Sequence, residues 1–251
     1  MNTLGLRRLC AAGAALLLAA CAGTPREADL AASPWAQQSG LPQGPACQPW
    51  AHRSFPGKTP NRFAPARVDG RDTIDVRADA SVSMLHQALR VEPADLGLLR
   101  FSWKVPALIP HADLAARDRD DAPVRIVLAF EGDRSRFSAR DAALSELVRV
   151  VTGEELPYAT LMYVWGNERA PGTVVHSPRT DRIRRIVVES GPAGLDQWRD
   201  YERDIRADYL HAFGEPPGAL VGLAIMTDSD NTHSQARAWY GPVRLLPGGA
   251  H

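Results

Sequence analysis

The sequence has no excess of charge of either sign. Its 251 residues include 29 basic and 29 acidic side chains, which gives a formal net charge of zero at pH 7. A protein that binds nucleic acid usually presents a basic face, so this balance argues against a nucleic-acid partner. Lysine is almost absent and occurs only at Lys58 and Lys104. We interpret the abundant arginine as a bias of composition and not as a sign of phosphate recognition.

The sequence also lacks the short motifs that mark common catalytic sites. It contains no G-x-S-x-G nucleophile motif, no phosphate-binding P-loop and no dinucleotide-binding glycine pattern. The histidines are scattered, without the H-E-x-x-H spacing of a zinc site. These absences argue against acyl transfer and nucleotide chemistry, and the motifs indicate no reaction.

The amino terminus has the pattern of a secretory leader. Arg7 and Arg8 precede an apolar run, Leu9–Ala20, that is too short to span a membrane. The run ends in Leu-Ala-Ala-Cys, which resembles the lipobox of bacterial lipoproteins and makes Cys21 the expected lipidated residue. The alternative is an ordinary signal peptide with a coincidental cysteine. Because Ala22 follows instead of aspartate, we expect an acyl-anchored protein of the outer membrane that faces the periplasm.

Cysteine is scarce, with three in the chain. Cys10 would leave with the signal peptide (residues 1–20) and Cys21 would carry lipid, so Cys47 cannot form an internal disulfide in the mature chain. Cys47 lies in a stretch rich in alanine, proline, glycine, glutamine and serine, and is either an inert linker cysteine or a reactive thiol. We expect residues 21–60 to be a flexible tether and residues 61–247 to form one domain.

From residue 61 onward, apolar residues recur mostly with a period of two, which predicts β-strands. The pattern is clearest in Leu98–Val105, while the more apolar Val124–Phe130 predicts a central strand. Thr73–Ala78 and Ser83–Leu89, separated by a short turn, suggest a hairpin. Further strands are predicted at Tyr158–Trp165, Gly172–His176, Ile183–Glu189, Leu220–Met226 and Gln235–Leu246.

Two segments depart from this period. In Ser138–Val151 the apolar residues recur at helical spacing, and Ser138 followed by Asp141 resembles a capping box, so we predict a helix there. Gln197–Phe213 fits a strand at its start and a helix at its end. Many short strands with one or two peripheral helices predict a mainly-β chain, folded as a sandwich or barrel.

Several segments in a fixed order resemble a known bacterial family. They are Phe101–Val105, Leu161–Trp165, Pro171–Val174, Ile186–Gly191, Tyr201–Asp204, Ala212–Pro216, Ile225–Thr232 and Ala238–Gly241. The series resembles the family called domain of unknown function 3047. That resemblance implies a jelly-roll-like β-sandwich similar to galactose-binding and carbohydrate-binding modules. It implies no catalytic residues, and a function argued from such a fold alone is analogy.

The loop after Met226 is the first candidate site. Asp228, Asp230 and Asn231 offer carboxylate and amide oxygens within a few residues, and such hard ligands suit Ca²⁺. The loop is not an EF-hand, because it lacks the glycine and the glutamate of that motif. Asp228 and Asp230 are therefore candidate metal ligands. The alternative is a simple turn in which these side chains bond their own backbone.

Trp165, Asn167 and Trp239 form a second candidate set. Indole rings stack on sugar rings, and amide or carboxylate groups orient a polyol by hydrogen bonds. With aromatic residues at 7% of the chain, the alternative is that both tryptophans belong to the core. Together with Asp228, Asp230 and Asn231, they are the candidate ligand-binding residues.

The sequence as a whole predicts a periplasm-facing lipoprotein that binds a carbohydrate or an envelope glycan. Two alternatives stay open: a glycan hydrolase or lyase on the same scaffold, and a structural interaction protein of the envelope. A binding module predicts an exposed aromatic platform, an enzyme predicts a cleft with paired carboxylates, and an interface protein predicts a large apolar patch. The sequence indicates neither the ligand nor the oligomeric state.

Overall fold

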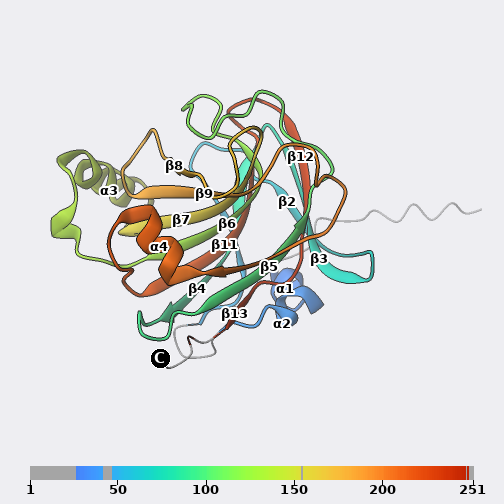
Figure 1. Cartoon of the computed structure of the whole chain (residues 1–251), viewed down its shortest axis with the longest axis horizontal. Helices are drawn as coiled ribbons and strands as arrows, with labels where there is room; N and C mark the ends of the chain where they lie inside the picture. The colour runs from blue at the N-terminus through green and yellow to red at the C-terminus, as the bar shows by residue number, and fades with distance from the viewer. Residues whose placement is uncertain (1–26, 42–46, 154, 247, 249–251) are drawn as a thin grey trace, which may run out of the picture.

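Two β-sheets form the fold (Figure 1). The computed structural model describes residues 27–41, 47–153, 155–246 and 248. A seven-stranded sheet has the order β1-β4-β11-β6-β7-β9-β8, and a six-stranded sheet contains β10-β5-β12-β3-β2, with β13 paired to β5. The strands are β1 (Ala51–Ser54), β2 (Arg62–Val68), β3 (Arg71–Asp79), β4 (Val82–Val91), β5 (Leu98–Lys104), β6 (Ala122–Phe130), β7 (Ala159–Gly166), β8 (Val174–His176), β9 (Ile183–Ser190), β10 (Arg199–Asp204), β11 (Leu220–Asp228), β12 (Gln235–Tyr240) and β13 (Arg244–Leu246).

The core lies between the two sheets and is filled by side chains that alternate along the strands. In β5 the residues Leu99, Phe101 and Trp103 point inward and are buried, as the period of two predicts. β6 lies between β11 and β7 inside the seven-stranded sheet, which explains its apolar sequence. Within the described part of the chain, all strand pairs are antiparallel except β7 with β9. The structure confirms the mainly-β, jelly-roll-like sandwich.

The described residues form four α-helices and one short 3-10 helix, all at the periphery of the sandwich (Figure 1). Among the described residues, none of these helices is long and apolar enough to cross a membrane. The helices are α1 (Glu27–Ala31), α2 (Pro34–Gln38), the 3-10 helix Arg134–Arg136, α3 (Ala139–Thr152) and α4 (Ile205–Phe213).

Helix α3 forms where its capping signal predicts it. The Ser138 hydroxyl accepts a hydrogen bond from the Asp141 amide at 3.1 Å, which satisfies an unpaired N–H of the first turn. The helix turns its polar side inward, because Asp141 and Ser145 are buried and Asp141 also accepts a hydrogen bond from Thr180. Its apolar side is largely exposed at Leu147, Val150 and Val151.

The ambiguous segment 197–213 contains both predicted elements. It forms β10 along the edge of the six-stranded sheet and then turns directly into α4. Asp204 ends the strand and caps the helix, since its carboxylate accepts a hydrogen bond from the Ala207 amide at 3.0 Å. Asp204 therefore marks the boundary between the strand and the helix, which the periodicity of the sequence does not locate.

The chain reversal predicted as a hairpin is an arch between the two sheets. β3 pairs with β2 and β12, whereas β4 pairs with β1 and β11, so Thr73–Ala78 and Ser83–Leu89 do not form a hairpin. The segment 221–241 likewise crosses from β11 in one sheet to β12 in the other. The two arches run side by side, because the Ser229 amide donates to the Ser81 carbonyl at 3.1 Å. This backbone bond between the arches replaces the ladder that a hairpin would form.

The folded region begins before residue 61, within the stretch expected to be a tether. Trp35 on α2 is fully buried and its ring lies 4.8 Å from that of Trp50. β1 pairs with the edge of the seven-stranded sheet at β4. This stretch is mostly polar, but burial of its two indole rings against the sandwich gives enough apolar contact to hold it in place. The signal peptide and the lipidation site Cys21 lie outside the described residues.

Candidate functional sites

Four aspartates meet at the end of the sandwich where β11 passes into the arch to β12. Asp120 and Asp121 immediately precede β6, Asp228 ends β11, and Asp230 lies in the arch. The strand register brings the two segments together, because Asp228 lies opposite Ala122. One carboxylate oxygen from each of Asp121, Asp228 and Asp230 lies within 4.8 Å of the others. These four residues are termed the aspartate cluster.

Two buried arginines neutralise part of this cluster. Arg125 on β6 places one guanidinium nitrogen 3.2 Å from Asp120 and 3.2 Å from Asp228. Arg185 on β9 pairs with the second oxygen of Asp120. Burial and the nearby Arg125 lower the pKa of Arg185 to about 10, so that Arg185 remains charged at neutral pH. Burial disfavours such charges, and these ion pairs offset that cost.

Asp121 fastens the arch to the segment before β6. Its carboxylate accepts hydrogen bonds from the backbone and side-chain amides of Asn231, at 3.2 and 2.8 Å. It also accepts bonds from the Thr232 amide and hydroxyl, at 2.8 and 2.6 Å. Burial alone would raise the pKa of Asp121, and these hydrogen bonds outweigh that effect and lower it. Lys58 pairs with Asp230 on the outer side of the cluster.

Asp228 is the least compensated member of the cluster. Its Oδ2 accepts a hydrogen bond from Arg125, while its Oδ1 is buried and has no hydrogen-bond donor among the described residues. Burial raises the pKa of Asp228 well above its usual range, and the charges of Asp121 and Asp230 add to the rise against the opposing effect of Arg125. When Asp228 carries a proton, it can donate a hydrogen bond to Asp230.

The cluster is enclosed, which limits the chemistry that it can perform. Asp120, Asp121 and Asp228 are each less than 10% exposed. Neither of the two cavities described below is lined by a member of the cluster. Paired carboxylates act in glycan hydrolysis only where a sugar can lie between them. The arrangement therefore favours holding charges, protons or a small cation over acting on a polymer.

A second polar surface lies on the outer face of the six-stranded sheet. Trp239 on β12 points away from the buried neighbours on its strand and is partly exposed, with the Arg237 guanidinium 4.4 Å from its ring centroid. Trp198, just before β10, donates from its indole nitrogen to Asp69 at 3.1 Å. Lys104 joins the two indoles, because its ammonium donates to Asp69 at 2.9 Å and lies 6.0 Å from the ring centroid of Trp239. Trp198, Trp239, Asp69 and Lys104 are termed the aromatic platform.

A tight turn positions one edge of this platform. β2 ends at Val68 and β3 begins at Arg71, so the connection consists of Asp69 and Gly70. Both residues have positive φ, 50° and 80°, as in the two-residue turns that match the twist of paired strands. The turn presents the Asp69 carboxylate to Lys104.

A groove of about 670 Å³ adjoins the platform through Arg71. The Arg71 guanidinium lies 4.9 Å from the Trp198 ring centroid and donates to Asp200 at 2.6 and 3.1 Å. Side chains that donate and accept hydrogen bonds dominate the lining of the groove. They include Arg67, Arg71, Arg100, Ser102, Asp200 and Arg244.

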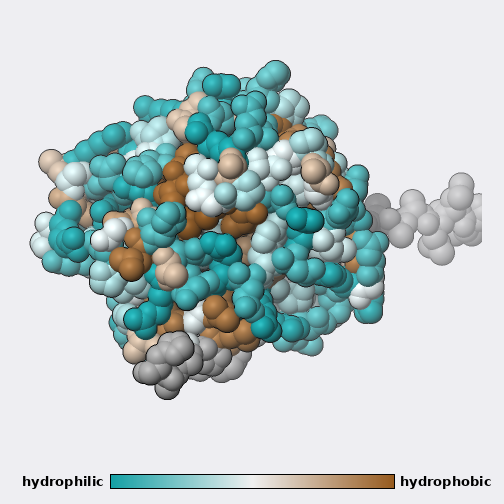
Figure 2. Space-filling view, viewed as in Figure 1, coloured by the Kyte–Doolittle hydropathy of each residue, from teal (hydrophilic) through white to brown (hydrophobic). Residues whose placement is uncertain are grey.

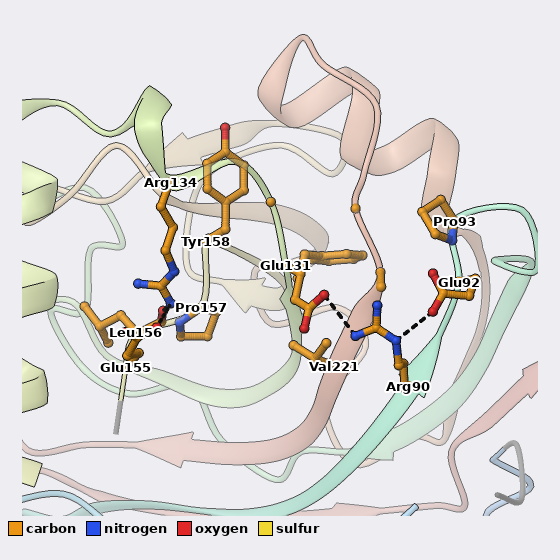
Figure 3. A pocket seen from close by; sticks show the side chains of 14 residues that line it. Arg90, Glu92, Pro93, Glu131, Arg134, Glu155, Leu156, Pro157, Tyr158 and Val221 are labelled. Atoms are coloured by element: carbon orange, nitrogen blue, oxygen red, sulfur yellow. Dashed lines mark hydrogen bonds and ion pairs between the residues drawn. The ribbon is translucent and has the colours of Figure 1, made fainter. Parts of the chain in front are cut away.

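Another cavity, of about 590 Å³, lies at the start of β11, the end of that strand away from the aspartate cluster (Figure 3). Arg90 lies between two carboxylates there, 2.6 Å from Glu92 and 2.9 Å from Glu131. Tyr158 and Arg134 line the other side of the cavity. The acids and bases drawn there neutralise one another in exposed ion pairs, which contribute little energy. We assign no chemistry to this cavity.

The structure separates the residues that the sequence suggests as ligand contacts. Asp228, Asp230 and Asn231 lie together at the arch. Trp165 is a core residue, 1% exposed, whose indole donates to the Gly191 carbonyl at 3.0 Å. Asn167 uses its side-chain amide to hold the Ile109 carbonyl at 2.8 Å. Trp239 lies on the other sheet, on the aromatic platform.

Sequence reasoning misses residues of both sites, among them Asp121, Trp198 and Asp69. Asp121 belongs to the polar loop before β6, and nothing in the neighbouring sequence indicates that it contacts the β11–β12 arch. Trp198 lies in the segment whose structure the periodicity leaves ambiguous. Asp69 has a signal that could have identified its place, since Asp-Gly between two alternating segments is typical of a hairpin turn.

Comparison with known proteins identifies a family. The family model described as "Protein of unknown function (DUF3047)" matches residues 48–244, and the chain belongs to that family. None of the curated proteins matches the chain. Among solved structures, the chain is similar to the xyloglucanase domain of NopAA, a type three effector from Sinorhizobium fredii, in complex with cellobiose. The identity is 10% and the TM-score 0.42, over 82% of this chain and 95% of that one. A likeness at this level carries no information on ligand or activity.

Proposed function

We propose that this member of the DUF3047 family is a glycan-binding module of the cell envelope. The observation that carries the proposal is the aromatic platform. Two partly exposed indoles lie on one sheet face and are linked through Asp69 and Lys104, within the span of a short oligosaccharide. Indole faces bind the apolar side of a sugar ring, while charged and amide groups beside them bind hydroxyls.

The adjoining groove supports a polar ligand. Arg71 contacts both the platform and the groove, so an oligosaccharide that covers the Trp198 ring would continue into a surface rich in hydrogen-bonding groups. The Arg71–Asp200 pair is exposed, so exchanging part of it for contacts with a ligand costs little. A neutral or acidic glycan fits this surface better than an apolar ligand.

Two observations make the alternatives less well supported. The aspartate cluster is enclosed, and the carboxylates that line the two cavities, such as Glu131 and Asp200, are held in ion pairs with arginines. The face in Figure 2 is largely hydrophilic, and its hydrophobic areas are separated from one another. Such a face lacks the continuous apolar patch of a stable protein interface.

The proposed location rests on the amino-terminal sequence. Lipidation of Cys21 would place the domain in the cell envelope, at the outer membrane and facing the periplasm. A glycan-binding surface there would meet envelope polysaccharides directly.

Binding of the full chain, purified in mild detergent, to an array of oligosaccharides and envelope glycan fragments tests the proposal. We expect a specific set of glycans to bind, and Trp239→Ala and Trp198→Ala each to weaken their binding by about ten-fold or more, equivalent to ~1.4 kcal/mol. Leu147→Ala is the matched control, because Leu147 is exposed on α3 and belongs to neither surface. Absence of any bound glycan, or two tryptophan variants that bind like the wild type, would refute the proposal.

A further inference from the structure

The aspartate cluster contains more negative than positive charge. Its four carboxylates pair with three cations among the described residues: Arg125, Arg185 and Lys58. Removing a charge from water is costly unless an opposite charge accompanies it. The remaining negative charge therefore requires a proton or a further cation.

We propose that Asp121, Asp228 and Asp230 bind a divalent cation, and that Ca²⁺ is the ion that fits these ligands. One oxygen of each residue lies within 4.8 Å of the others, so a single ion can contact all three. The ligands are hard oxygens, carried by the end of β11, its arch to β12 and the segment before β6. Ca²⁺ accepts such ligands in flexible geometry, whereas zinc favours the nitrogen and sulfur of histidine and cysteine.

An unpartnered atom of the cluster points independently to a ligand. Asp228 is 7% exposed, and its Oδ1 is buried without a hydrogen-bond donor among the described residues. A buried acceptor without a partner loses the free energy of the bonds that it makes with water. A cation between Asp228 and its two neighbours would satisfy this oxygen and neutralise the excess charge together.

Lys58 marks the route by which an ion enters. Its ammonium contacts Asp230 from the solvent side, and its side chain is 45% exposed, whereas that of Asp230 is 8% exposed. An incoming cation would displace this ammonium toward water. Lys58 is therefore an exchangeable counter-ion for the site.

The bound ion would connect two separate parts of the chain. Asp121 belongs to the segment before β6, and Asp228 with Asp230 to the end of β11 and its arch to β12. These parts lie where the chain crosses between the two sheets. The ion would thus stabilise the end of the sandwich, independently of glycan binding on the aromatic platform.

Calcium titration of the full chain tests the proposal. The protein, in mild detergent and stripped of metal with EDTA, is titrated with CaCl₂ in a calorimeter, and its thermal unfolding is followed with and without Ca²⁺. We expect one ion per chain and a higher unfolding temperature in its presence. Asp228→Asn removes a ligand and should weaken Ca²⁺ binding by about ten-fold or more.

Two further variants separate metal binding from a general effect on folding. Lys58→Gln changes an exposed side chain and removes the competing ammonium, so it should bind Ca²⁺ several-fold more tightly. Glu202→Gln changes an exposed carboxylate on the other sheet and should bind like the wild type. The proposal fails if the wild type shows neither binding nor a shift in unfolding, if Asp228→Asn keeps the wild-type affinity, or if Lys58→Gln binds no more tightly than the wild type.

Discussion

Replacing Arg125 by methionine tests the energetic role of the aspartate cluster. The Arg125 side chain is 2% exposed, and one of its nitrogens lies 3.2 Å from each of Asp120 and Asp228. Methionine keeps most of the volume and removes the charge, which leaves two buried carboxylates short of a partner. Breaking a buried ion pair from one side costs about 3–5 kcal/mol. For a domain of this size, that loss lowers the unfolding temperature by about 6–20 °C.

The pH dependence of this loss follows from Asp228. Because burial raises the pKa of Asp228, its protonated form is favoured in the folded state. The stabilisation that protonation gives is present at low pH and is lost as the pH rises through the raised pKa. Arg125 opposes the rise, so its removal raises the pKa of Asp228 further. The loss of stability of Arg125→Met relative to the wild type should therefore be smaller at pH 5 than at pH 7.5.

The assay is thermal unfolding followed by circular dichroism, in EDTA at both pH values. The double variant Arg125→Met with Asp228→Asn should recover part of the lost stability at pH 7.5, since it removes one unpaired carboxylate. The reasoning is wrong if Arg125→Met unfolds within about 3 °C of the wild type, or if the double variant is no more stable than Arg125→Met alone.

Two further predictions concern α3 and the membrane anchor. Hydrogen bonds from Thr180, Ser138 and the Asp181 amide outweigh the effect of burial and lower the pKa of Asp141. The ionised form of Asp141 therefore stabilises the fold at pH values above the ordinary carboxyl pKa. This stabilisation is lost as the pH falls through the lowered pKa. Asp141→Asn should therefore speed hydrogen exchange and proteolysis of α3 at pH 7, with a difference from the wild type that narrows in acid; equal protection at pH 7 would contradict this role. Cys21→Ser should move the protein from the membrane to the soluble fraction of fractionated cells, and unchanged membrane retention would refute the proposed anchor.

Local signals in the sequence predict much of the fold. The alternation in Leu98–Val105 identifies β5, which ends one residue earlier at Lys104, because a strand exposes one face to the core and the other to solvent. The Ser138 cap identifies the start of α3 because the first turn of a helix needs an acceptor for its unpaired N–H groups. The side of α3 that faces inward does not follow from its periodicity, since the contact of Asp141 with Thr180 decides it.

Strand pairing and the composition of the sites depend on residues far apart in the chain. A short turn between β3 and β4 is compatible with a hairpin or with an arch, and the choice depends on β11 and β12, which are distant in sequence. The sequence singles out Asp228 and Asp230 because they are neighbours, but the strand register alone brings Asp121 beside them. Trp165 and Trp239 look equivalent in sequence, and only packing separates the core residue from the surface residue.

The aromatic platform is tested most directly by residue-resolved oxidation of the tryptophans. Trp198 and Trp239 are partly exposed, and the other four tryptophans, Trp35, Trp50, Trp103 and Trp165, are at most 3% exposed. Limited oxidation of the full chain, read by mass spectrometry, should therefore modify Trp198 and Trp239 first. Saturation with the oligosaccharide that binds most tightly on the array should protect both residues. If that oligosaccharide binds and leaves the oxidation of both tryptophans unchanged, the glycan site is not the aromatic platform.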